Sequence, residues 1–488
     1  MSIGTVGKSN FTKAVKALLN RIYDDTPVAD SLFEQATLWF RGAAEREQQQ
    51  AELEQQVFLF KNRQAQANKG DQALIERNLQ QVQNEQELFN NQQQQDKLIR
   101  YESLRRLCLD ILALSESDSY DETNIQTAKM LGTIQLMSPT VGKHIAPTNQ
   151  KSKHLYKALL SLRLLERLLL DNQITQPFIV QRYQAAKQTA AEDEYQPFRD
   201  DVQVPLLMAA LLQDIGSCHP DAQLILKGAV GDLDEFRVLE NDERTELLKI
   251  SYRESLNFVV QAIGIGVYQG NSKEQRDRYL QIEREKQALL IFLLKNAIKP
   301  EHGVGNLLKI PQIYTSVVLS TKANYSYESL PKVGLVLEKG VEKGVYSPVA
   351  VSGLLQISGV FPQGFGITYI PKDSDRQDLD RYEYAIVTGL YPQDPKMPIC
   401  RMVTRNLTYN VSAQGCVVSV ENNLYYPLAR KKLERVTEER LLEILSKLVS
   451  NFEERKTMAL LPKCWHPREY FSYSKNQNLW NKAVINQN

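Results

Sequence analysis

The sequence predicts a mainly α-helical protein with an N-terminal helical region that contains a coiled-coil hairpin and with a small C-terminal antiparallel β extension. Apolar residues recur at helical spacing before Gly344, glutamine dominates one stretch among them, and strand signals follow that glycine. A chain of 488 residues is too long for a single hydrophobic core. We therefore expect four consecutive parts, which are residues 1–110, 111–345, 346–430 and 431–488.

The composition restricts the classes of function. The 59 basic and 58 acidic residues nearly cancel, which argues against a global charge that attracts nucleic acid or an anionic membrane. The five cysteines are scattered without a CxxC pair, as is typical of a reducing compartment. The first residues show no signal-peptide pattern, and the longest apolar runs, such as 289–294, are too short to cross a bilayer. These observations predict a cytoplasmic protein without a membrane span and without a nucleic-acid partner.

The first 43 residues predict two short helices. Ser9 can cap the first helix, which carries apolar residues at helical spacing. The segment 24–27 breaks that pattern, and Asp30 or Ser31 can open a second helix that carries Trp39.

From about residue 44 to residue 100, the composition shifts to Gln, Glu and Asn. A turn-like segment at 68–71 separates two stretches with apolar residues at 3–4 spacing, which are Leu53, Val57 and Phe60 before it and Leu79 and Val82 after it. This pattern predicts a helical hairpin or coiled-coil arm. A flexible Gln-rich linker is the alternative, because the apolar seam is thin.

Residues 101–345 are expected to be predominantly helical. The segment 155–169 is apolar nearly all round, which is typical of a buried helix, and 206–212 repeats the pattern. Residues 283–295 predict another helix, which ends before Pro300.

The sequence pattern changes after Gly344, where β-branched and aromatic runs alternate with the turn-forming residues Pro, Gly, Asn and Asp. The strand signals fall at residues 366–370, 382–390, 400–411 and 416–420. They predict a small antiparallel sheet or barrel. Residues 438–452 then predict an amphipathic helix, and the polar tail after Tyr473 is expected to be loose.

One short motif carries the functional argument. The apolar stretch 209–212 runs into Gln213 and Asp214, and Gly216 then lets the backbone turn. This arrangement resembles the way in which helical phosphohydrolases of the HD superfamily present a His-Asp pair to metal ions, with glutamine at the histidine position. A carboxamide is a poor ligand for catalytic transition metals, because its nitrogen has no lone pair to donate.

Within that superfamily, the chain resembles a degenerate member of the HD-GYP family, the helical phosphodiesterases that hydrolyse cyclic di-GMP. Residues 214–227 resemble the segment in which the HD pair leads into a loop and the next helix, with Ser217 where the family often has a phosphate-contacting lysine. Residues 346–351 and 359–364 resemble the closing helix and strand entry of the family, although no Gly-Tyr-Pro tripeptide occurs. The resemblance covers about residues 150–410 and implies an HD-like helical core.

Catalysis in the HD-GYP family requires two or three metal ions held by spaced histidines and aspartates. The resemblance implies that His154 stands at the first ligand position and Asp214 at the aspartate of the HD pair. Between His219 and the later Pro-x-Gly turn the only histidine is His302, and residues 278–372 contain no aspartate. At least four of the family's ligands are therefore missing, and the remaining residues predict no polynuclear metal site.

We expect a catalytically inactive HD-GYP-like regulator or scaffold in bacterial signalling through cyclic di-GMP, without a cofactor. Its partner would be a protein or a second copy of the chain, bound through residues 44–100. A cyclic dinucleotide site would place basic side chains beside stacking surfaces such as Tyr268 or Tyr279, with Arg276 and Lys309 as candidates. The other interpretation of the basic run that contains Arg276 is a solvated helix face.

Two alternative functions remain open at this point. The first is an active metal-dependent phosphohydrolase, such as a cyclic di-GMP phosphodiesterase, with iron or manganese at a rearranged site formed by His154, Asp214 and His219. The second is a purely structural protein that associates with itself through the Gln-rich hairpin. Asp214 also has a structural interpretation, as a helix-terminal carboxylate that accepts backbone hydrogen bonds near Gly216.

Overall fold

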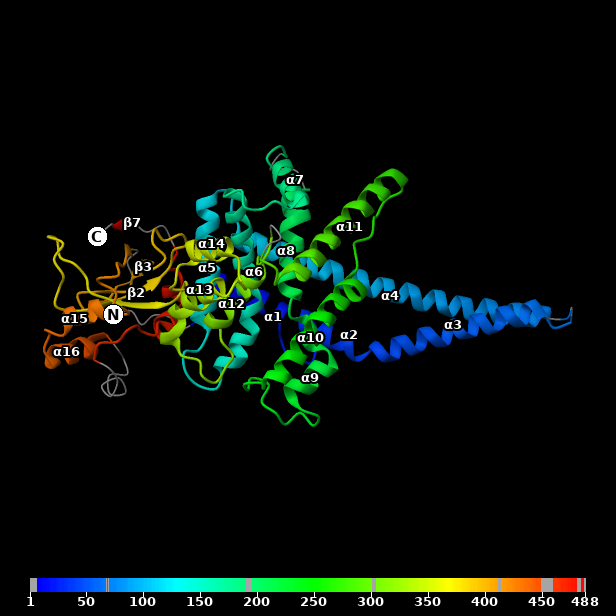
Figure 1. Ribbon diagram of the computed structural model, residues 1–488, viewed down its shortest axis with the longest axis horizontal. Coiled ribbons are helices and arrows are strands. Elements are labelled where there is room, and N and C mark those ends of the chain that lie inside the picture. The colour runs from blue at the N-terminus through cyan, green and yellow to red at the C-terminus, as the bar shows by residue number, and fades with distance from the viewer. Residues whose placement is uncertain are drawn as a thin grey trace. The chain divides into compact units, whose positions relative to one another are not determined.

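The protein is described here by a computed structural model. The structure describes residues 7–66, 68, 70–189, 195–300, 304–410, 414–448, 460–480 and 484–486. The fold is mainly α-helical with a small sheet in its C-terminal part, as the sequence predicts (Figure 1). Among the helices of the described ranges, none combines the length and the apolar character needed to cross a bilayer.

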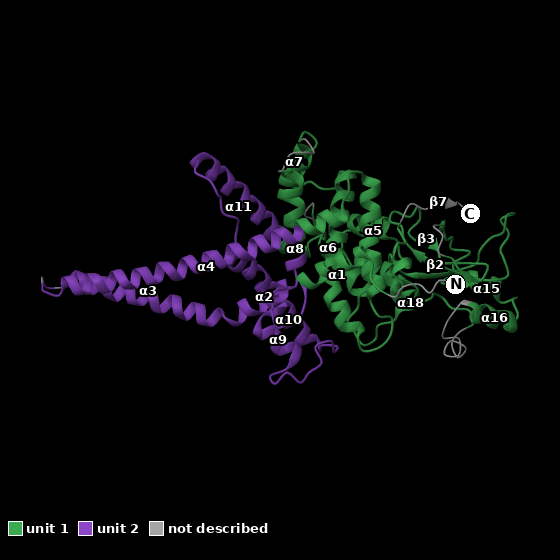
Figure 2. Cartoon of the chain, turned by 180° about the vertical axis from the view of Figure 1, so that it is seen from behind, with its two compact units in different colours: residues 1–22, 109–210, 293–488 green, residues 23–108, 211–292 purple. Residues whose placement is uncertain are grey.

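The chain divides into two compact units (Figure 2). Unit 1 comprises residues 1–22, 109–210 and 293–488, and unit 2 comprises residues 23–108 and 211–292. Both units are therefore discontinuous in sequence. The four consecutive parts expected from composition stay a prediction, because local composition does not reveal which distant helices share a core.

Unit 1 contains most of the helices of the chain. Its helical elements are α1 (Asn10–Ile22), α5 (Tyr120–Met137), α6 (Ile145–Leu170), α7 (Pro177–Ala186), the π-helix η1 (Arg199–Gln203), α8 (Val204–Leu212), α12 (Lys309–Val318), the 3-10 helix η4 (Tyr327–Lys332), α13 (Val333–Glu342), α14 (Pro348–Ser358), α15 (Pro427–Leu433), α16 (Glu438–Leu448), α18 (Arg468–Ser472) and the 3-10 helix η5 (Ser474–Gln477). The last residues of α8 belong to unit 2.

The core of unit 1 forms around α6, which is buried on nearly all sides, as its apolar composition predicts. Helices α1, α5, α12 and α14 pack against it. At the start of α1, Ser9 acts as the predicted cap, because its Oγ accepts from the Thr12 amide at 3.2 Å.

The sheet of unit 1 has the strand order β1-β2-β3-β6-β7. Its members are β1 (Gly366–Tyr369), β2 (Glu383–Val387), β3 (Ile399–Met402), β6 (Gln414–Val417) and β7 (Val484–Asn486). Neighbours from β1 to β6 are antiparallel, and β7 runs parallel to β6. The run expected at 400–411 contains most of β3 and two further short strands, β4 (Thr404–Arg405) and β5 (Thr408–Tyr409). Asn406 and Leu407 adopt positive φ and turn β4 back onto β5. Residue 411 lies outside the described residues.

Residues 474–480 are packed, contrary to the expectation that the tail after Tyr473 is loose. The Gln477 carboxamide oxygen accepts from the Ser9 amide at 2.7 Å, which joins the two ends of the chain. Trp480 is buried, and its Nε1 donates to the Thr388 carbonyl oxygen at 2.8 Å. Polar composition did not predict this packing, because the partners of these side chains are distant in sequence.

Unit 2 is built from a helical hairpin and a group of shorter helices. Its elements are α2 (Leu32–Arg41), α3 (Ala43–Gln66), α4 (Gln72–Ser115), the 3-10 helix η2 (Ile215–Cys218), α9 (Pro220–Lys227), α10 (Asn241–Asn257), the π-helix η3 (Phe258–Ile263) and α11 (Lys273–Asn296). The last residues of α4 and α11 belong to unit 1. Ser31 opens α2 through a capping box with Glu34.

Helices α3 and α4 form the predicted hairpin and run side by side from its tip (Figure 1). In the turn, the Asp71 amide donates to the Asn68 carbonyl oxygen at 3.1 Å. The thin apolar seam closes into a cluster of Val57, Leu79 and Val82, with Leu53 and Phe60 packed against it. The hairpin is therefore a helical structure and not a flexible linker.

Candidate functional site

The HD-like motif lies where α8 ends and η2 begins. The Gly216 amide donates to Ser255 Oγ at 2.9 Å, and that hydroxyl donates to the Gln213 carbonyl oxygen at 3.2 Å. A Cβ at position 216 would lie 2.1 Å from the Ser251 carbonyl oxygen. The glycine therefore allows close packing of η2 against α10, which is a structural reason for its presence in the motif.

Asp214 and Ser217 bond to each other within this turn. The Asp214 carbonyl oxygen accepts from the Ser217 amide at 3.1 Å and from Ser217 Oγ at 2.7 Å. The main chain of Asp214 supplies the acceptor in these bonds, and the expected role of its carboxylate as an acceptor of backbone hydrogen bonds stays a prediction. The Ser217 hydroxyl, at the position where the family often has a lysine, is engaged inside the turn.

The three candidate metal ligands do not belong to one unit. His154 is fully buried in α6 of unit 1, whereas Asp214 and His219 belong to unit 2. Among the residues that the structure describes, no group of three or more His, Cys, Asp or Glu is placed to hold a metal ion. His302 lies outside the described residues. A metal site at His154, Asp214 and His219 stays a prediction.

His219 lines a cavity of about 860 Å³ in unit 2. Its Nδ1 caps α9 by accepting from the Asp221 amide at 3.2 Å, so Nε2 carries the proton of the neutral ring and is the donor. The ring packs edge-on against Phe40, with 5.4 Å between the centroids. The cavity is lined by Trp39, Phe40, Ala43, Arg46, Glu47, Gln50, Phe89, Asn90, Gln93, Gln94, Lys97, Arg100, His219, Glu254, Asn257 and Gln261.

Three cations from the base of the hairpin face this cavity. Arg46 comes from α3, and Lys97 and Arg100 come from α4. Arg46 Nη2 donates to the Trp39 carbonyl oxygen at 2.6 Å, and Arg100 Nε donates to the Ala262 carbonyl oxygen at 2.8 Å. Within the described ranges, none of the three cations forms an ion pair with a carboxylate. Neutral main-chain partners therefore position the two arginines, and the described carboxylates act on them only through longer-range charge.

Burial and mutual repulsion disfavour the charged forms of these three cations. Burial lowers the pKa of Arg46, Lys97 and Arg100. Repulsion from Arg100 lowers the pKa of Lys97 further, and repulsion from Arg46 does the same for Arg100. The charges of Glu47 and Asp96 partly offset these effects at Arg46, and the charge of Asp96 does so at Arg100. A cluster of partly desolvated cations of this kind is stabilised by a bound anion.

Two acids line the same cavity, Glu47 and Glu254, and the second is balanced by its neighbours. Glu254 accepts from Arg253 Nε at 2.6 Å and from Asn257 Nδ2 at 3.0 Å. Although burial favours the neutral acid, hydrogen bonds from Asn257 and Arg253 lower the pKa of Glu254. Because these neighbours balance its charge, Glu254 competes little with a ligand for the three cations.

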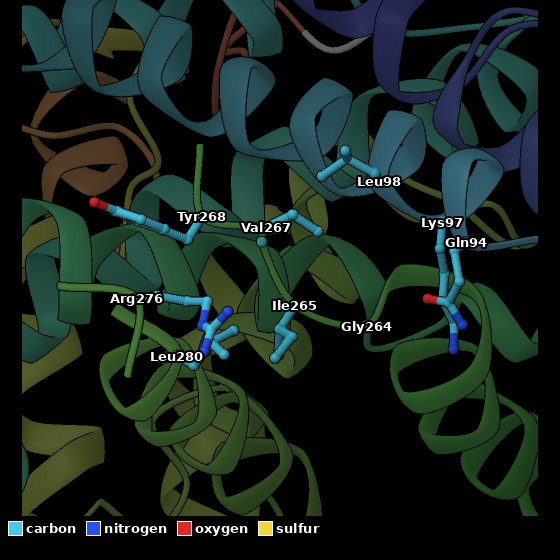
Figure 3. Close-up of a pocket in the computed structure, with 10 residues that line it drawn as sticks. Gln94, Lys97, Leu98, Gly264, Ile265, Val267, Tyr268, Arg276 and Leu280 are labelled. Carbon is cyan, nitrogen blue, oxygen red and sulfur yellow. The ribbon is translucent and has the colours of Figure 1, made fainter. Parts of the chain in front are cut away.

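A second cavity, of about 290 Å³, adjoins the first through shared residues (Figure 3). Its wall includes Gln94 and Lys97, which also line the larger cavity. The rest of the wall comes from α4, from the loop after η3 and from α11, and consists of Leu98, Gly264, Ile265, Gly266, Val267, Tyr268, Arg276 and Leu280. The structure thus brings the predicted Arg276 to the same cavity as the predicted stacking surface of Tyr268.

The other residues of the predicted nucleotide site are placed differently. The Tyr279 ring lies 5.9 Å from the Tyr268 ring, centroid to centroid, and the two planes are tilted by 49°. Lys309 belongs to α12 in unit 1, where its Nζ donates to Gln312 Oε1 at 3.0 Å. Arg276 and Lys309 therefore do not share a unit.

A buried carboxylate holds the loop that lines the smaller cavity. Glu283 Oε2 accepts from Tyr101 Oη at 2.6 Å and from the Gly266 amide at 2.9 Å. Its other oxygen pairs with Lys286 Nζ at 2.5 Å. Burial and the neighbouring charge of Glu283 raise the pKa of Tyr101 well above its usual value, so this phenol remains a donor. The network fixes the loop backbone opposite α4.

Comparisons with known protein families, with curated proteins and with solved structures find no match for this chain. The geometry of the two cavities therefore carries the functional argument. Sequence reasoning missed Arg46, Lys97 and Arg100, although a signal existed. These cations lie at similar distances before and after the predicted turn at 68–71, and a helical hairpin brings such positions together at its base.

Proposed function

We propose that this protein is a non-catalytic, cytoplasmic regulator or scaffold whose unit 2 binds a nucleotide-type anion at the base of the hairpin. One observation carries the proposal. Arg46, Lys97 and Arg100 face one cavity and have no carboxylate partner among the described residues. Half-buried cations that form no ion pair favour phosphate, to which guanidinium groups donate in pairs.

The size and lining of the cavities support a ligand of nucleotide dimensions. Cavities of about 860 and 290 Å³ lie within the range that holds small molecules and cofactors. In the proposed arrangement, the phosphate groups lie at the three cations. A base lies in the smaller cavity beside Tyr268, where Arg276 supplies a further donor. A cyclic dinucleotide such as cyclic di-GMP is the first ligand to test.

The part of the proposal that concerns catalysis rests on the sequence. Gln213 stands at the histidine position of the HD-like motif, and a carboxamide holds a catalytic metal poorly. Regulation would then follow from ligand occupancy, because both helices of the hairpin contribute cations and are bridged by one anion. The rest of the hairpin would carry a protein partner or a second copy of the chain.

Calorimetric titration of the full chain tests the binding proposal. The probes are cyclic di-GMP, ATP and inorganic pyrophosphate, each at low ionic strength, where surface charge is least screened. We expect at least one nucleotide to bind, and Lys97→Gln to weaken it about tenfold, which corresponds to about 1.4 kcal/mol. The matched control is Lys61→Gln, an exposed change on α3 that lines neither cavity and should leave the affinity unchanged. The absence of heat for all three probes at high micromolar concentration would refute the proposal.

The active alternative is separated from this proposal by hydrolysis assays. It retains interest because His219 lines the cavity that holds the cations, so a bound phosphodiester would lie near this ring. Cyclic di-GMP and bis(p-nitrophenyl) phosphate are incubated with the protein and Mn²⁺ or Fe²⁺. If the protein contains stoichiometric metal and its turnover is lost in Asp214→Ala, the protein is a phosphohydrolase and the regulator proposal is wrong.

The partner role of the hairpin has its own test. Phe58 on α3 and Leu88 on α4 are 63% and 69% exposed, so both side chains are accessible to a partner. If the hairpin mediates self-association, Phe58→Gln combined with Leu88→Gln lowers the mass measured by light scattering. If the parent protein and the double variant both have the mass of one chain, the hairpin does not mediate self-association, and its partner would be a different protein.

A further inference from the structure

A cavity of about 480 Å³ in unit 1 has no part in the proposed function of unit 2. It is lined by Lys8 and by residues of α1, α5 and α6, together with α18 and η5 near the C-terminal end. Its wall consists of Gly7, Lys8, Thr12, Lys16, Leu19, Leu136, Met137, Thr148, Lys151, Ser152, Arg468, Phe471, Ser472 and Gln477.

Positive charge gathers on one part of this wall. The cationic lining residues are Lys8, Lys16, Lys151 and Arg468, and the described lining contains no acid. Lys8 and Lys16 are close enough that Lys16 lowers the pKa of Lys8 through side-chain contact, with smaller contributions from burial and charge repulsion. Two ammonium groups in such proximity are held against their mutual repulsion, which an anion between them would relieve.

The remaining wall is largely apolar. Leu19, Leu136 and Phe471 are buried, with exposed fractions of 4%, 3% and 4%, and Met137 is half-buried. These side chains lie at the cavity while the cations lie at its rim, where Lys8, Lys16 and Arg468 are exposed. An apolar interior with a cationic rim matches a ligand that has an apolar body and an anionic head.

The wall is held together by a single polar side chain. Gln477 Oε1 accepts from Thr12 Oγ1 at 2.9 Å, and its Nε2 donates to the Gly7 carbonyl oxygen at 2.7 Å and to the Phe471 carbonyl oxygen at 2.9 Å. These bonds join the entry to α1 with α18 and η5. The Ser9 amide also donates to Gln477 Oε1, at 2.7 Å, so both N–H groups and both acceptor positions of this carboxamide are satisfied within unit 1.

We propose that this cavity binds a small amphipathic anion, with a carboxylate or phosphate head at the lysines and an aliphatic or aromatic body against Leu19, Leu136 and Phe471. The size of the cavity favours a free ligand of medium chain length over a lipid that remains in a bilayer. This cavity shares no lining residue with the nucleotide-type site, which belongs to the other unit.

Titration calorimetry on the full chain with three probes tests the match between ligand and cavity. Octanoate carries both the head and the body, octanol lacks the charge, and inorganic phosphate lacks the apolar body. We expect octanoate to bind at least about tenfold more tightly than either of the others, because each probe loses one of the two contributions. Equal affinity for octanol, or tighter binding of phosphate, would overturn the proposal.

Variants assign the binding to this cavity. Lys16→Gln should weaken octanoate about fivefold, and Lys16→Arg should restore most of the affinity, since only the charge is required. Lys13→Gln is the matched control, because Lys13 is an exposed lysine of the same helix that does not line the cavity. Equal affinity in Lys16→Gln and Lys13→Gln would place the ligand elsewhere. Thermal unfolding of each variant verifies that the fold is retained.

A vesicle experiment distinguishes the free ligand from a membrane lipid. The chain is sedimented with phosphatidylglycerol vesicles, with and without octanoate. We expect the chain to remain in the supernatant while it binds octanoate in the titration. Sedimentation with vesicles in the absence of any octanoate binding would refute the free-ligand proposal.

Discussion

The guanidinium carbon of Arg46 lies 4.9 Å from the centroid of the Trp39 ring. Arg46 Nη2 also donates a hydrogen bond to the main-chain carbonyl oxygen of Trp39. The aromatic face and the main chain therefore hold one guanidinium in place from two sides. Neither partner carries a negative charge, so the arginine is oriented at the cavity of unit 2 while its charge remains available to a ligand.

Replacing Arg46 by lysine should separate the contribution of geometry from that of charge. Arg46→Lys keeps the positive charge but loses the planar group that stacks on Trp39 and donates in pairs. We expect the affinity for cyclic di-GMP to fall about tenfold, measured by titration calorimetry. The matched control is Arg77→Lys, on the exposed surface of α4 and outside both cavities. An unchanged affinity in Arg46→Lys would mean that this arginine acts only as a point charge.

Removing the charge of Lys97 should stabilise the protein in the absence of ligand. Burial and the charge of Arg100 lower the pKa of Lys97, so at neutral pH the folded state holds a charge that its surroundings disfavour. Lys97→Gln should raise the free energy of unfolding by about 0.5 kcal/mol at low salt, less when salt screens the repulsion. Urea denaturation at two salt concentrations measures this difference, with Lys61→Gln as the control. A loss of stability in Lys97→Gln would contradict the repulsion among these cations.

Adding a methyl group at Gly216 should disrupt the packing of η2. The new Cβ would lie 2.1 Å from the Ser251 carbonyl oxygen and 2.7 Å from the Ser255 amide nitrogen, both of which belong to the backbone of α10. Because backbone atoms cannot move aside cheaply, we expect Gly216→Ala to cost about 3 kcal/mol of unfolding free energy. Gly70→Ala, where no atom lies within 4 Å of the new Cβ, is the control and should change little. An unchanged urea midpoint for Gly216→Ala would show that η2 and α10 are packed less tightly than these distances indicate.

The carboxyl group of Glu166 should make the stability of unit 1 depend on pH. Burial raises the pKa of Glu166 to about 7, despite the nearby charge of Arg163, which also pairs with Glu116 at 2.7 Å. The native state therefore holds a proton that the unfolded state releases at lower pH, so stability falls as the pH rises from about 4.5 to about 7.

The variant Glu166→Gln tests this dependence. The amide cannot ionise, and Arg163 retains Glu116 as its partner. We expect the difference in unfolding free energy between Glu166→Gln and the parent protein to shift in favour of the variant across this pH range and to become constant above it. Urea denaturation at several pH values gives that difference. A difference that does not vary with pH would mean that Glu166 is ionised throughout.

Local patterns in the sequence predicted much of the secondary structure. Of the two residues expected to open α2, Asp30 and Ser31, it is Ser31 that caps the helix. The apolar segment 155–169 of α6 is buried, as its pattern predicts. The apolar seam of the Gln-rich stretch was sufficient to predict the hairpin, since α3 and α4 are neighbours in sequence. Each of these features depends on residues that are close along the chain.

The candidate site could not be predicted in the same way. Its cavity combines Arg46, Lys97 and His219, which come from three separated segments, and only the fold brings them together. The motif around Asp214 directed attention to metal binding, whereas the feature that the structure adds is the cluster of cations. The packing of Trp480 was missed for the same reason, because its partner Thr388 lies in a different part of the chain.

Lys97 forms part of the wall of both cavities of unit 2, so occupancy of one alters the electrostatic potential in the other. An anion bound near Arg46 and Arg100 would neutralise the ammonium group that a second anion near Arg276 also needs. Two separate anions would therefore bind antagonistically, and by thermodynamic reciprocity each would weaken the other by the same factor. A single ligand that occupies both cavities avoids this antagonism. Unit 2 would therefore bind one ligand that spans the two cavities in preference to two smaller anions.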